Sequence, residues 1–405
     1  MSLRAAIAAA LVLCAAPVAA QTPDYARIRA AEAAQAATAL AAATRDLCGQ
    51  RIVLLGENGS HGDGKTGAFK ADLVRNLVAE CGFDAVVFEA SLYDFTALNR
   101  AVRRGDATPQ MLASAMGGLW NQNREVQDLI GFLFAQARDG RVLLAGMDDQ
   151  LGSRGAFYSL ETMPLELAGF LPLGRREDCA VRLKQRIWSR YTAEDPYDDA
   201  SRAALRACLS EIDAVVATAR LDDPKDRAEY RGMIAAFGRT LNHDTLGHPG
   251  RIHARDRDMA RNVEALVDAL PADARVVVWT ANSHAARDAS THELFGDQSN
   301  MGHLLDVRFG TDLFAVGVTA AGGAYRYTVR EARPIPAAAP GSLEAAALAG
   351  SSAEVVWIGS EALSALPPMV GSAFDHARPV TAEWGRVFDG LVVFRTERPP
   401  YRLDE

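Results

Sequence analysis

Side chains of the kind that move protons gather in one loop near the start of the chain. The loop ENGSHGDGKTG contains Glu57, His61 and Lys65, and it follows the apolar run RIVLLG. A second carboxylate, Glu89, lies at the end of the apolar run DAVVFEA, and His284 follows the later run VVVW. A neutral imidazole can take a proton from water near pH 7, and a carboxylate beside it fixes its tautomer and stabilises the imidazolium. These residue types predict acid–base chemistry in which a histidine activates water.

The places of these residues in the pattern imply that they stand at the ends of strands. Short apolar runs typical of buried strands recur along the chain, and helical patterns separate most of them. The runs span residues 51–56, 84–89, 141–148, 275–281, 313–319, 354–359 and 391–395. Ligands of an open α/β sheet collect at the carboxyl ends of its strands, where His61 and Glu89 should both lie. We therefore expect an α/β fold with a largely parallel central sheet flanked by helices.

Two segments depart from this alternation. Residues 313–331 contain two strand patterns around Gly322-Gly323, which is typical of a hairpin, here at the C-terminal edge of the sheet, and residues 333–341 follow as a connector. Between Asp148 and Arg275 helical runs and polar loops occur without a strand pattern. We expect this stretch, about residues 150–270, to form an inserted helical lobe over the strand ends.

The first twenty residues have the pattern of a targeting segment. A charged start at Arg4 precedes the apolar stretch 5–16 and the small residues of 18–20. This order is typical of a cleavable signal peptide over residues 1–20. The mature domain, residues 21–405, is then secreted or periplasmic. No other apolar run approaches the ~18 residues of a transmembrane helix, so no membrane span is expected.

Export makes the cysteines candidates for disulfide bonds, because an oxidising compartment favours them. Four cysteines remain after the signal peptide is removed. Cys48 and Cys81 stand just before the first two strands, whose starts would be adjacent if the strands are neighbours. The preferred pairs are therefore Cys48–Cys81 and, in the helical region, Cys179–Cys208. Buried free thiols are the alternative, and the absence of CxxC argues against a thiol-redox site or a zinc ribbon.

Composition and motifs narrow the functional class. The 405 residues are 49% hydrophobic and 23% charged, as in ordinary soluble domains, and the net charge of −8 argues against a nucleic-acid partner. No G-x-S-x-G occurs, which disfavours a serine hydrolase, and no HExxH occurs. We expect no cofactor. Imidazole and carboxylate suit zinc or iron, so the residues that would hold a metal ion, if one is bound, are His61, His284, Glu57 and Glu89.

The first loop also satisfies a phosphate-binding pattern. GSHGDGKT, residues 59–66, matches G-x-x-x-x-G-K-[ST] and lies between a strand and a helix, as a P-loop does. A P-loop nucleotide-binding protein, with Lys65 at the phosphates, is thus one alternative function.

Several sequence blocks, taken in order, resemble the erythromycin esterase family. A strand ending in Gly-Glu, a nearby His-Gly, a helix and a strand ending in glutamate come first. LWNQNREVQDLIGFL, AGMD, RDRDMARN, VVVWTANSH, MGHLL and FDGLVVF follow in the order of the family. The resemblance covers roughly residues 45–396.

This resemblance implies a hydrolase that cleaves an ester, in the best-known members a macrolide lactone, by attack of water. His61 falls on the loop histidine that acts as general base, Glu89 on the second-strand glutamate, and His284 on the second histidine of H-N-x-H. Glu57 is a further supporting carboxylate. Candidate contacts to the substrate or to the oxyanion are other polar residues of these segments: Lys65, Lys70, Arg255 and Asn282.

The sequence departs from the family pattern at three places. Three residues instead of two separate Glu57 from His61, which predicts a bulge at Gly59. Ala281 replaces the first histidine of H-N-x-H, and Lys70 stands where arginine is common.

Structural roles for the candidate residues stay open at this stage. Glu57 could cap the following turn, His61 could be an ordinary loop residue, and His284 could cap a helix. The sequence thus favours an exported hydrolase of a small-molecule ester or lactone. A noncatalytic or metal-binding member of the same fold is the alternative.

Overall fold

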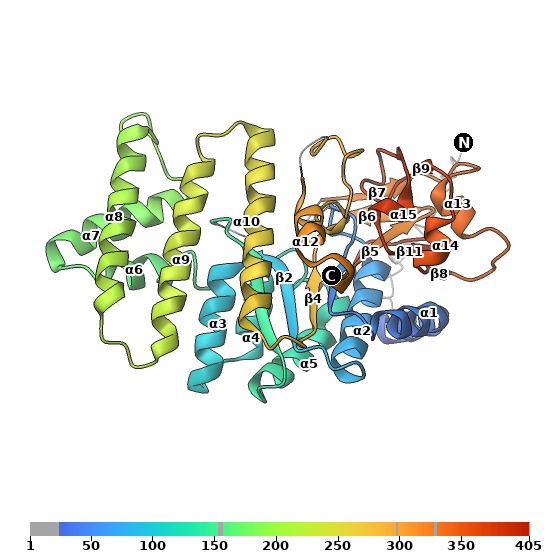
Figure 1. The fold of residues 1–405 in the computed structure, drawn as a ribbon, viewed down its shortest axis with the longest axis horizontal. Helices are drawn as coiled ribbons and strands as arrows, with labels where there is room; N and C mark the ends of the chain where they lie inside the picture. The colour runs from blue at the N-terminus through green and yellow to red at the C-terminus, as the bar shows by residue number, and fades with distance from the viewer. Residues whose placement is uncertain (1–23, 153–156, 297–298, 328–329, 405) are drawn as a thin grey trace, which may run out of the picture.

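The computed structural model describes residues 24–152, 157–296, 299–327 and 330–404 (Figure 1). The predicted signal peptide lies outside these residues. Within them, no helix is both long enough and apolar enough to cross a bilayer.

All seven expected strands form one sheet, in the order β3-β2-β4-β1-β5-β11-β8. Neighbouring strands are parallel except β8, which runs antiparallel to β11 at the edge. The expectation of a largely parallel central sheet is confirmed. The strands are β1 Ile52–Leu55, β2 Ala85–Ser91, β3 Leu143–Asp148, β4 Val276–Trp279, β5 Leu313–Ala320, β8 Val355–Ile358 and β11 Gly390–Phe394.

The expected edge hairpin is wrong. β5 lies inside the sheet between β1 and β11, because both of its faces are buried. Gly323, with φ 108°, turns the chain away, and β6 (Gly323–Arg326) pairs with β7 (Ala332–Ile335) in a separate two-stranded sheet. The start of the segment expected as a connector therefore forms β7. A third small sheet pairs β9 (Met369–Gly371) with β10 (Val380–Ala382).

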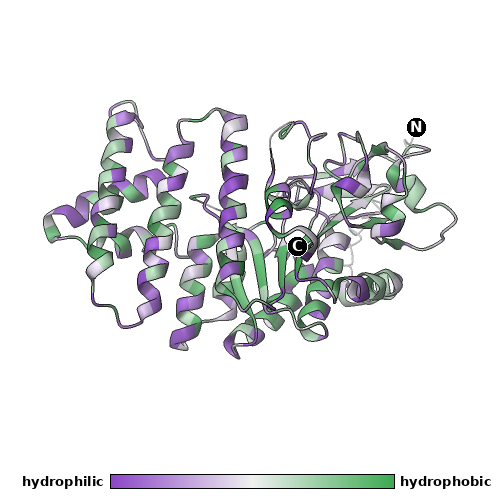
Figure 2. Ribbon diagram, in the orientation of Figure 1, coloured by the Kyte–Doolittle hydropathy of each residue, from purple (hydrophilic) through white to green (hydrophobic). Residues whose placement is uncertain are grey.

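Helices cover both faces of the main sheet. Along β1 the side chains alternate, so that Val53 and Leu55 join one hydrophobic core and Ile52 and Leu54 the other. Figure 2 shows the strands as apolar and the helices with polar outer faces. The first face packs against α1 Tyr25–Leu47, α2 Gly64–Ala79, α3 Leu92–Arg104, α4 Pro109–Met116, η1 Arg124–Val126 and α5 Gln127–Arg138. The second face carries α10 His248–Ala269, α11 Asn282–Ala285, α12 Met301–Phe309, η2 Gly310–Asp312, α13 Leu343–Ala347, α14 Ser360–Ser364 and α15 Trp384–Val387.

The inserted helical lobe has a hydrophobic core of its own. It consists of α6 (Thr162–Ala168), α7 (Leu173–Ile187), α8 (Asp199–Thr218) and α9 (Pro224–His243). Figure 1 shows these helices beside the sheet, whereas the sequence analysis expected them over the strand ends. Tyr93 of α3 belongs to the lobe's core, which explains this lateral placement. α10, which packs on β3 and on α9, connects the lobe with the site described below.

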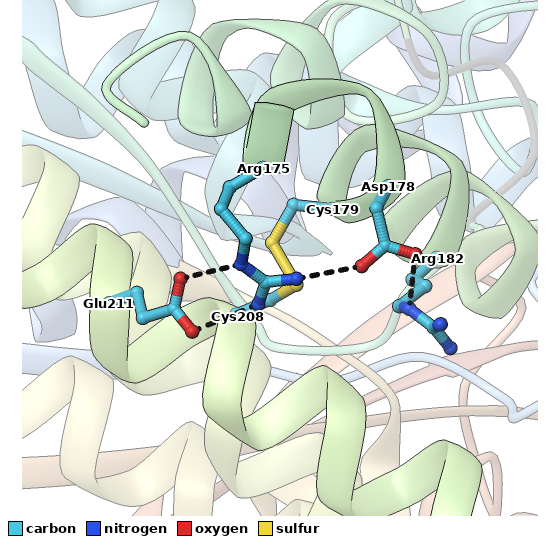
Figure 3. The surroundings of a disulfide bond; sticks show 6 residues. All are labelled: Arg175, Asp178, Cys179, Arg182, Cys208 and Glu211. Atoms are coloured by element: carbon cyan, nitrogen blue, oxygen red, sulfur yellow. Dashed lines mark hydrogen bonds and ion pairs between the residues drawn. A yellow bond between two sulfur atoms is a disulfide. The ribbon is translucent and has the colours of Figure 1, made fainter. Parts of the chain in front are cut away.

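The two disulfides join the expected pairs, Cys48–Cys81 and Cys179–Cys208. The argument for the first pair was wrong, because β4 lies between β1 and β2 and the two strands are not neighbours. The bridge instead links the ends of α1 and α2, which pack together. The second bridge links α7 to α8, beside an ion-pair chain of Arg175, Asp178, Arg182 and Glu211 (Figure 3).

Removing the lobe's disulfide should destabilise the protein. The Cys179→Ser, Cys208→Ser double variant should lose about 3 kcal/mol of unfolding free energy, because the bridge closes a loop with a sequence separation of 29. Urea unfolding under non-reducing conditions measures this loss. The Cys179→Ser single variant is the control, since it removes the same bond and should lose about as much. An unchanged urea midpoint in both variants would contradict a stabilising bridge.

Candidate active site

The carboxyl ends of four adjacent strands bring the polar residues together. β4 lies between β1 and β2, and β3 follows β2. Glu57 comes just after β1, Glu89 lies near the end of β2, Asp148 ends β3, and Thr280 comes just after β4. All four side chains are buried. A buried polar group must be paired, so these side chains form a hydrogen-bonded network at one edge of the sheet.

The first part of the network pairs His61 with Glu57. His61 Nδ1 lies 2.8 Å from Glu57 Oε1, which also accepts a hydrogen bond of 2.8 Å from Trp120 Nε1. Glu57 Oε2 lies 3.0 Å from Lys70 Nζ, and the Lys70 side chain is completely buried. Burial by itself would raise the pKa of Glu57, but the charges of Lys70 and His61 outweigh burial and lower the pKa to about 2. Glu57 is therefore ionised at neutral pH.

This pairing fixes which nitrogen of His61 can act as a base. Against an ionised carboxylate, Nδ1 carries the proton and donates, which leaves Nε2 of the neutral ring as the acceptor. The ring also packs edge-on against Trp120, with centroids 5.3 Å apart. The backbone of His61 has φ 52°, a left-handed conformation that costs energy for a residue other than glycine. The surrounding structure therefore holds His61 in a defined pose.

The second part of the network surrounds Glu89. Oε1 accepts a hydrogen bond of 2.9 Å from Arg255 and lies 3.4 Å from His284 Nε2. Oε2 accepts bonds from Thr280 Oγ1 (2.8 Å) and from the amide of Ala281 (2.9 Å). Burial would raise the pKa of Glu89, but the charges of His284, Arg255 and His61 hold it far below its ordinary value. Lys70, the partner of Glu57, donates to the carbonyl of Thr280 at 3.4 Å, so Thr280 connects the two parts of the network.

Asp256 orients His284 through the Nδ1 atom of its ring. Its carboxylate lies 3.0 Å from His284 Nδ1 and also accepts the amide of Met301 at 2.8 Å. Burial lowers the pKa of His284, but Asp256 and Glu89 raise it more, so that the pKa ends above its ordinary value. His284 is thus stabilised as an imidazolium, and Arg255, which also binds Asp148 at 2.8 Å, places a second cation beside it.

Three of the four expected substrate contacts are turned elsewhere. Lys70 is buried beneath Glu57, over the ring of Trp279 at 4.2 Å, so it supports the carboxylate rather than a ligand. Lys65 donates through Nζ to Thr396. Asn282 donates to the carbonyls of Val318 and Ala373 and accepts a hydrogen bond from the Val318 amide. Its side chain therefore binds the backbone of neighbouring segments. Of the four, Lys70 supports the first part of the network from within, and Arg255 belongs to the second part through Glu89 and Asp148.

Sequence reasoning missed some members of the network. Trp120 and Asp148 were noted only as parts of blocks, and Asp256, Trp279 and Thr280 were given no role. Asp256 is adjacent to Arg255 in a run of alternating charges, which looks like a solvated helix face, although Asp256 is completely buried. Its partner His284 is 28 residues away, so no local spacing could have revealed the pair.

The phosphate-binding alternative does not fit the structure. The amides of Lys65 and Thr66, which a P-loop would offer to phosphate, donate to the carboxylate of Glu397 at 2.7 and 3.0 Å. The Gly64 amide donates to the carbonyl of Arg398. A buried carboxylate therefore occupies the position that an anion would need, and Lys65 points away from it to Thr396.

The arrangement also bears on a metal ion. Within the described ranges, no three His, Cys, Asp or Glu side chains are placed to share one ion. The Arg255 guanidinium already donates to Glu89 and Asp148, and His61 turns Nδ1 to Glu57. The four residues named as possible ligands are thus divided between two hydrogen-bonded clusters.

The fold and the site together define an α/β protein with an acid–base centre of two histidine–carboxylate pairs at the carboxyl ends of parallel strands. The erythromycin esterase family model matches residues 78–395. The chain belongs to the erythromycin esterase family, which supports a hydrolase of the esterase type. The matched region begins within α2, so the loop with Glu57 and His61 precedes it.

Three solved structures are similar to this chain in fold. A mutant of the erythromycin esterase EreC in its open conformation is 17% identical, with a TM-score of 0.60 over 87% of this chain and 92% of that one. A structure titled succinoglycan biosynthesis protein is 15% identical, and a Bacillus cereus protein is 16% identical. Each of these two has a TM-score of 0.64 over 88% of this chain and 91% of its own. At these identities the likeness shows the fold alone.

Proposed function

We propose that this protein is an exported hydrolase that cleaves a small-molecule ester or lactone by attack of water, with His61 as the general base. The observation that supports this proposal most is the His61–Glu57 pair. Glu57 fixes the tautomer that leaves Nε2 able to accept a proton, and it stays ionised to stabilise the imidazolium that forms.

In the proposed reaction, the substrate forms no covalent bond with the enzyme. His61 Nε2 takes a proton from water as the oxygen of that water attacks the carbonyl carbon. The negative charge that develops on the carbonyl oxygen is stabilised by the cations of Arg255 and His284, which Glu89, Asp148 and Asp256 hold in place. When the tetrahedral intermediate collapses, the His61 imidazolium returns its proton to the leaving alkoxide. The products are the acid and the alcohol.

The alanine at position 281 limits what we propose about the substrate. Its amide donates to Glu89, but its methyl side chain supplies no imidazole where the family pattern has one. The proposal therefore specifies the bond that is cleaved, an ester or lactone, and does not extend to a macrolide.

Export is proposed together with this activity. The signal-peptide pattern of residues 1–20 supports it, and the two disulfides fit an oxidising compartment. Fractionation of cells that produce the full chain, followed by determination of the N-terminus of the product, tests this part. A cytoplasmic chain that retains its first residues would contradict it.

Hydrolysis is tested by offering the mature protein a panel of macrolide lactones and simple esters. Mass spectrometry should detect a product that has gained one water, and a chelator should not change the rate. Loss of the activity on chelation and its return with zinc or iron would contradict the metal-free mechanism. Absence of product across the panel would contradict the hydrolase and favour a noncatalytic binding member of the fold.

A further inference from the structure

The last residues of the chain hold the far end of the loop that carries His61. Glu397 is buried, and its carboxylate accepts four hydrogen bonds. The donors are the amides of Lys65 (2.7 Å), Thr66 (3.0 Å) and Arg398 (2.8 Å) and the hydroxyl of Thr66 (2.8 Å). All four donors point at the carboxylate, and two of the amides belong to the first turn of α2. A negative charge at a helix N-terminus is favourable, so Glu397 stabilises the start of α2.

Backbone contacts place Glu397 in a fixed position. Its amide donates to the carbonyl of Gly322 at 2.9 Å, and its carbonyl accepts the amide of Ala324 at 3.1 Å. The next carbonyl, that of Arg398, accepts the amide of Gly64 at 2.7 Å. The C-terminal segment thus runs between β6 and the loop and bonds to both.

A second buried pair holds the same end of the loop. Asp63 lies 3.1 Å from Nε2 of His376, and both side chains are almost completely buried. The ring of His376 packs against Tyr325 of β6, with centroids 5.2 Å apart. Burial and the charge of Asp63 raise the pKa of Glu397 to about 7. The Asp63–His376 pair thus holds the residue just before α2, next to the turn that Glu397 binds.

These contacts flank a backbone that needs support. The His61 backbone is left-handed, and its amide donates to Asn58, within the loop itself. On the other side, the amide of Arg326 in β6 donates to the carbonyl of Gly62, and a side chain at Gly62 would collide with Arg326. The loop is thus held at both ends. Its start continues directly from β1, and the residues after His61 bond to β6 and to the C-terminal segment.

We propose that Glu397 is a positioning residue for the reaction: by binding the first turn of α2, it holds the loop in which His61 faces Glu57. This inference rests on the proposed function of His61. Glu397 does not touch the reacting atoms, and it acts only through the loop. Glu397 lies beyond the region that the family model matches, residues 78–395.

The test compares Glu397→Ala with Glu344→Gln. Glu344 is a matched control, because it is also a buried carboxylate of the C-terminal half and accepts a hydroxyl (Thr319) and an amide (Ser372), but it does not contact the loop. In Glu397→Ala we expect kcat to fall about 10²-fold with little change in KM, as a misplaced catalytic group causes. Added formate, which can enter the vacated position and accept the same amides, should restore part of kcat. Glu344→Gln should show neither effect.

A second readout is independent of any substrate. In Glu397→Ala, the imidazole chemical shifts of His61, assigned by their absence in His61→Gln, should change, and formate should move them back. Unchanged His61 shifts, or equal changes in Glu344→Gln, would overturn the positioning role. If the shifts change and respond to formate while no ester is cleaved by the wild-type protein, the positioning role holds and the proposed hydrolysis fails.

Discussion

The His61→Gln variant should remain folded and lose about 10²- to 10⁴-fold in kcat, the usual contribution of a general base. Glutamine can keep a hydrogen bond to Glu57 but cannot take a proton from water. His61 is on a loop, and its side chain is 9% exposed, so its replacement removes little from the hydrophobic core. The loss should therefore appear in turnover, with the unfolding transition close to that of the wild type.

Rates on the best substrate of the ester and lactone panel, together with thermal unfolding, measure both parts of this expectation. His248→Ala is the control, because His248 is exposed at the start of α10, where the network is not formed. Retention of wild-type kcat in His61→Gln would remove His61 from the mechanism. An equal loss in His248→Ala would show that the effect is unspecific.

The Lys70→Met variant should lose about 3–5 kcal/mol of unfolding free energy at pH 7, as expected when one partner of a buried ion pair is removed. Methionine fills a similar volume but leaves the Glu57 charge buried, with His61 and Trp120 as its remaining partners. Chemical denaturation at pH 7 measures the loss. Lys65→Met is the matched control on the same helix. It should change stability little, because Lys65 is partly exposed and its ammonium donates to the hydroxyl of Thr396.

The dependence of this loss on pH identifies its cause. In the wild type the pKa of Glu57 is lowered to about 2, so its stabilising contribution is complete above pH 4.5 and is lost as the pH falls towards 2. Without Lys70, burial should raise the pKa of Glu57, and protonation at low pH should relieve the buried charge. The stability difference between Lys70→Met and the wild type should therefore shrink as the pH falls.

A second substitution separates charge from packing. The Glu57→Gln, Lys70→Met double variant should regain much of the lost stability at pH 7, because neither partner is then charged. A double variant as unstable as Lys70→Met, with a pH-independent difference from the wild type, would show that packing around the lysine stem causes the loss.

The sheet could be predicted from the sequence because its strands are buried on both faces. Runs such as IVLL and VVVW have no polar residue to suggest another structure, and all seven strands of the sheet were predicted. The same property explains the error at β5. Its continuation through Gly322-Gly323 resembles a hairpin, and only tertiary packing decides that β5 pairs with β1 and β11 instead.

The site could be predicted only where neighbouring residues or family blocks carry the signal. His61 and Glu57 are four residues apart, and their contact follows from a single loop. The strand order that places β4 between β1 and β2 is a property of the whole sheet, so the contacts of Glu89 with Thr280 and Ala281 could not be read from spacing. Polarity alone also led to wrong predictions of substrate contacts, because the side chains of Lys65, Lys70 and Asn282 bind structural partners.

The contact of Glu397 with Lys65 spans 332 residues of chain, and this separation has a genetic consequence. The ribosome makes the loop of His61 long before the segment that holds it, because that segment is encoded 332 codons further on. A premature stop codon before residue 397 would leave every residue of the acid–base network in the translated product and still deprive the loop of its anchor. Truncated alleles of this kind should therefore be scored as loss-of-function alleles, even when all the residues of the network are intact.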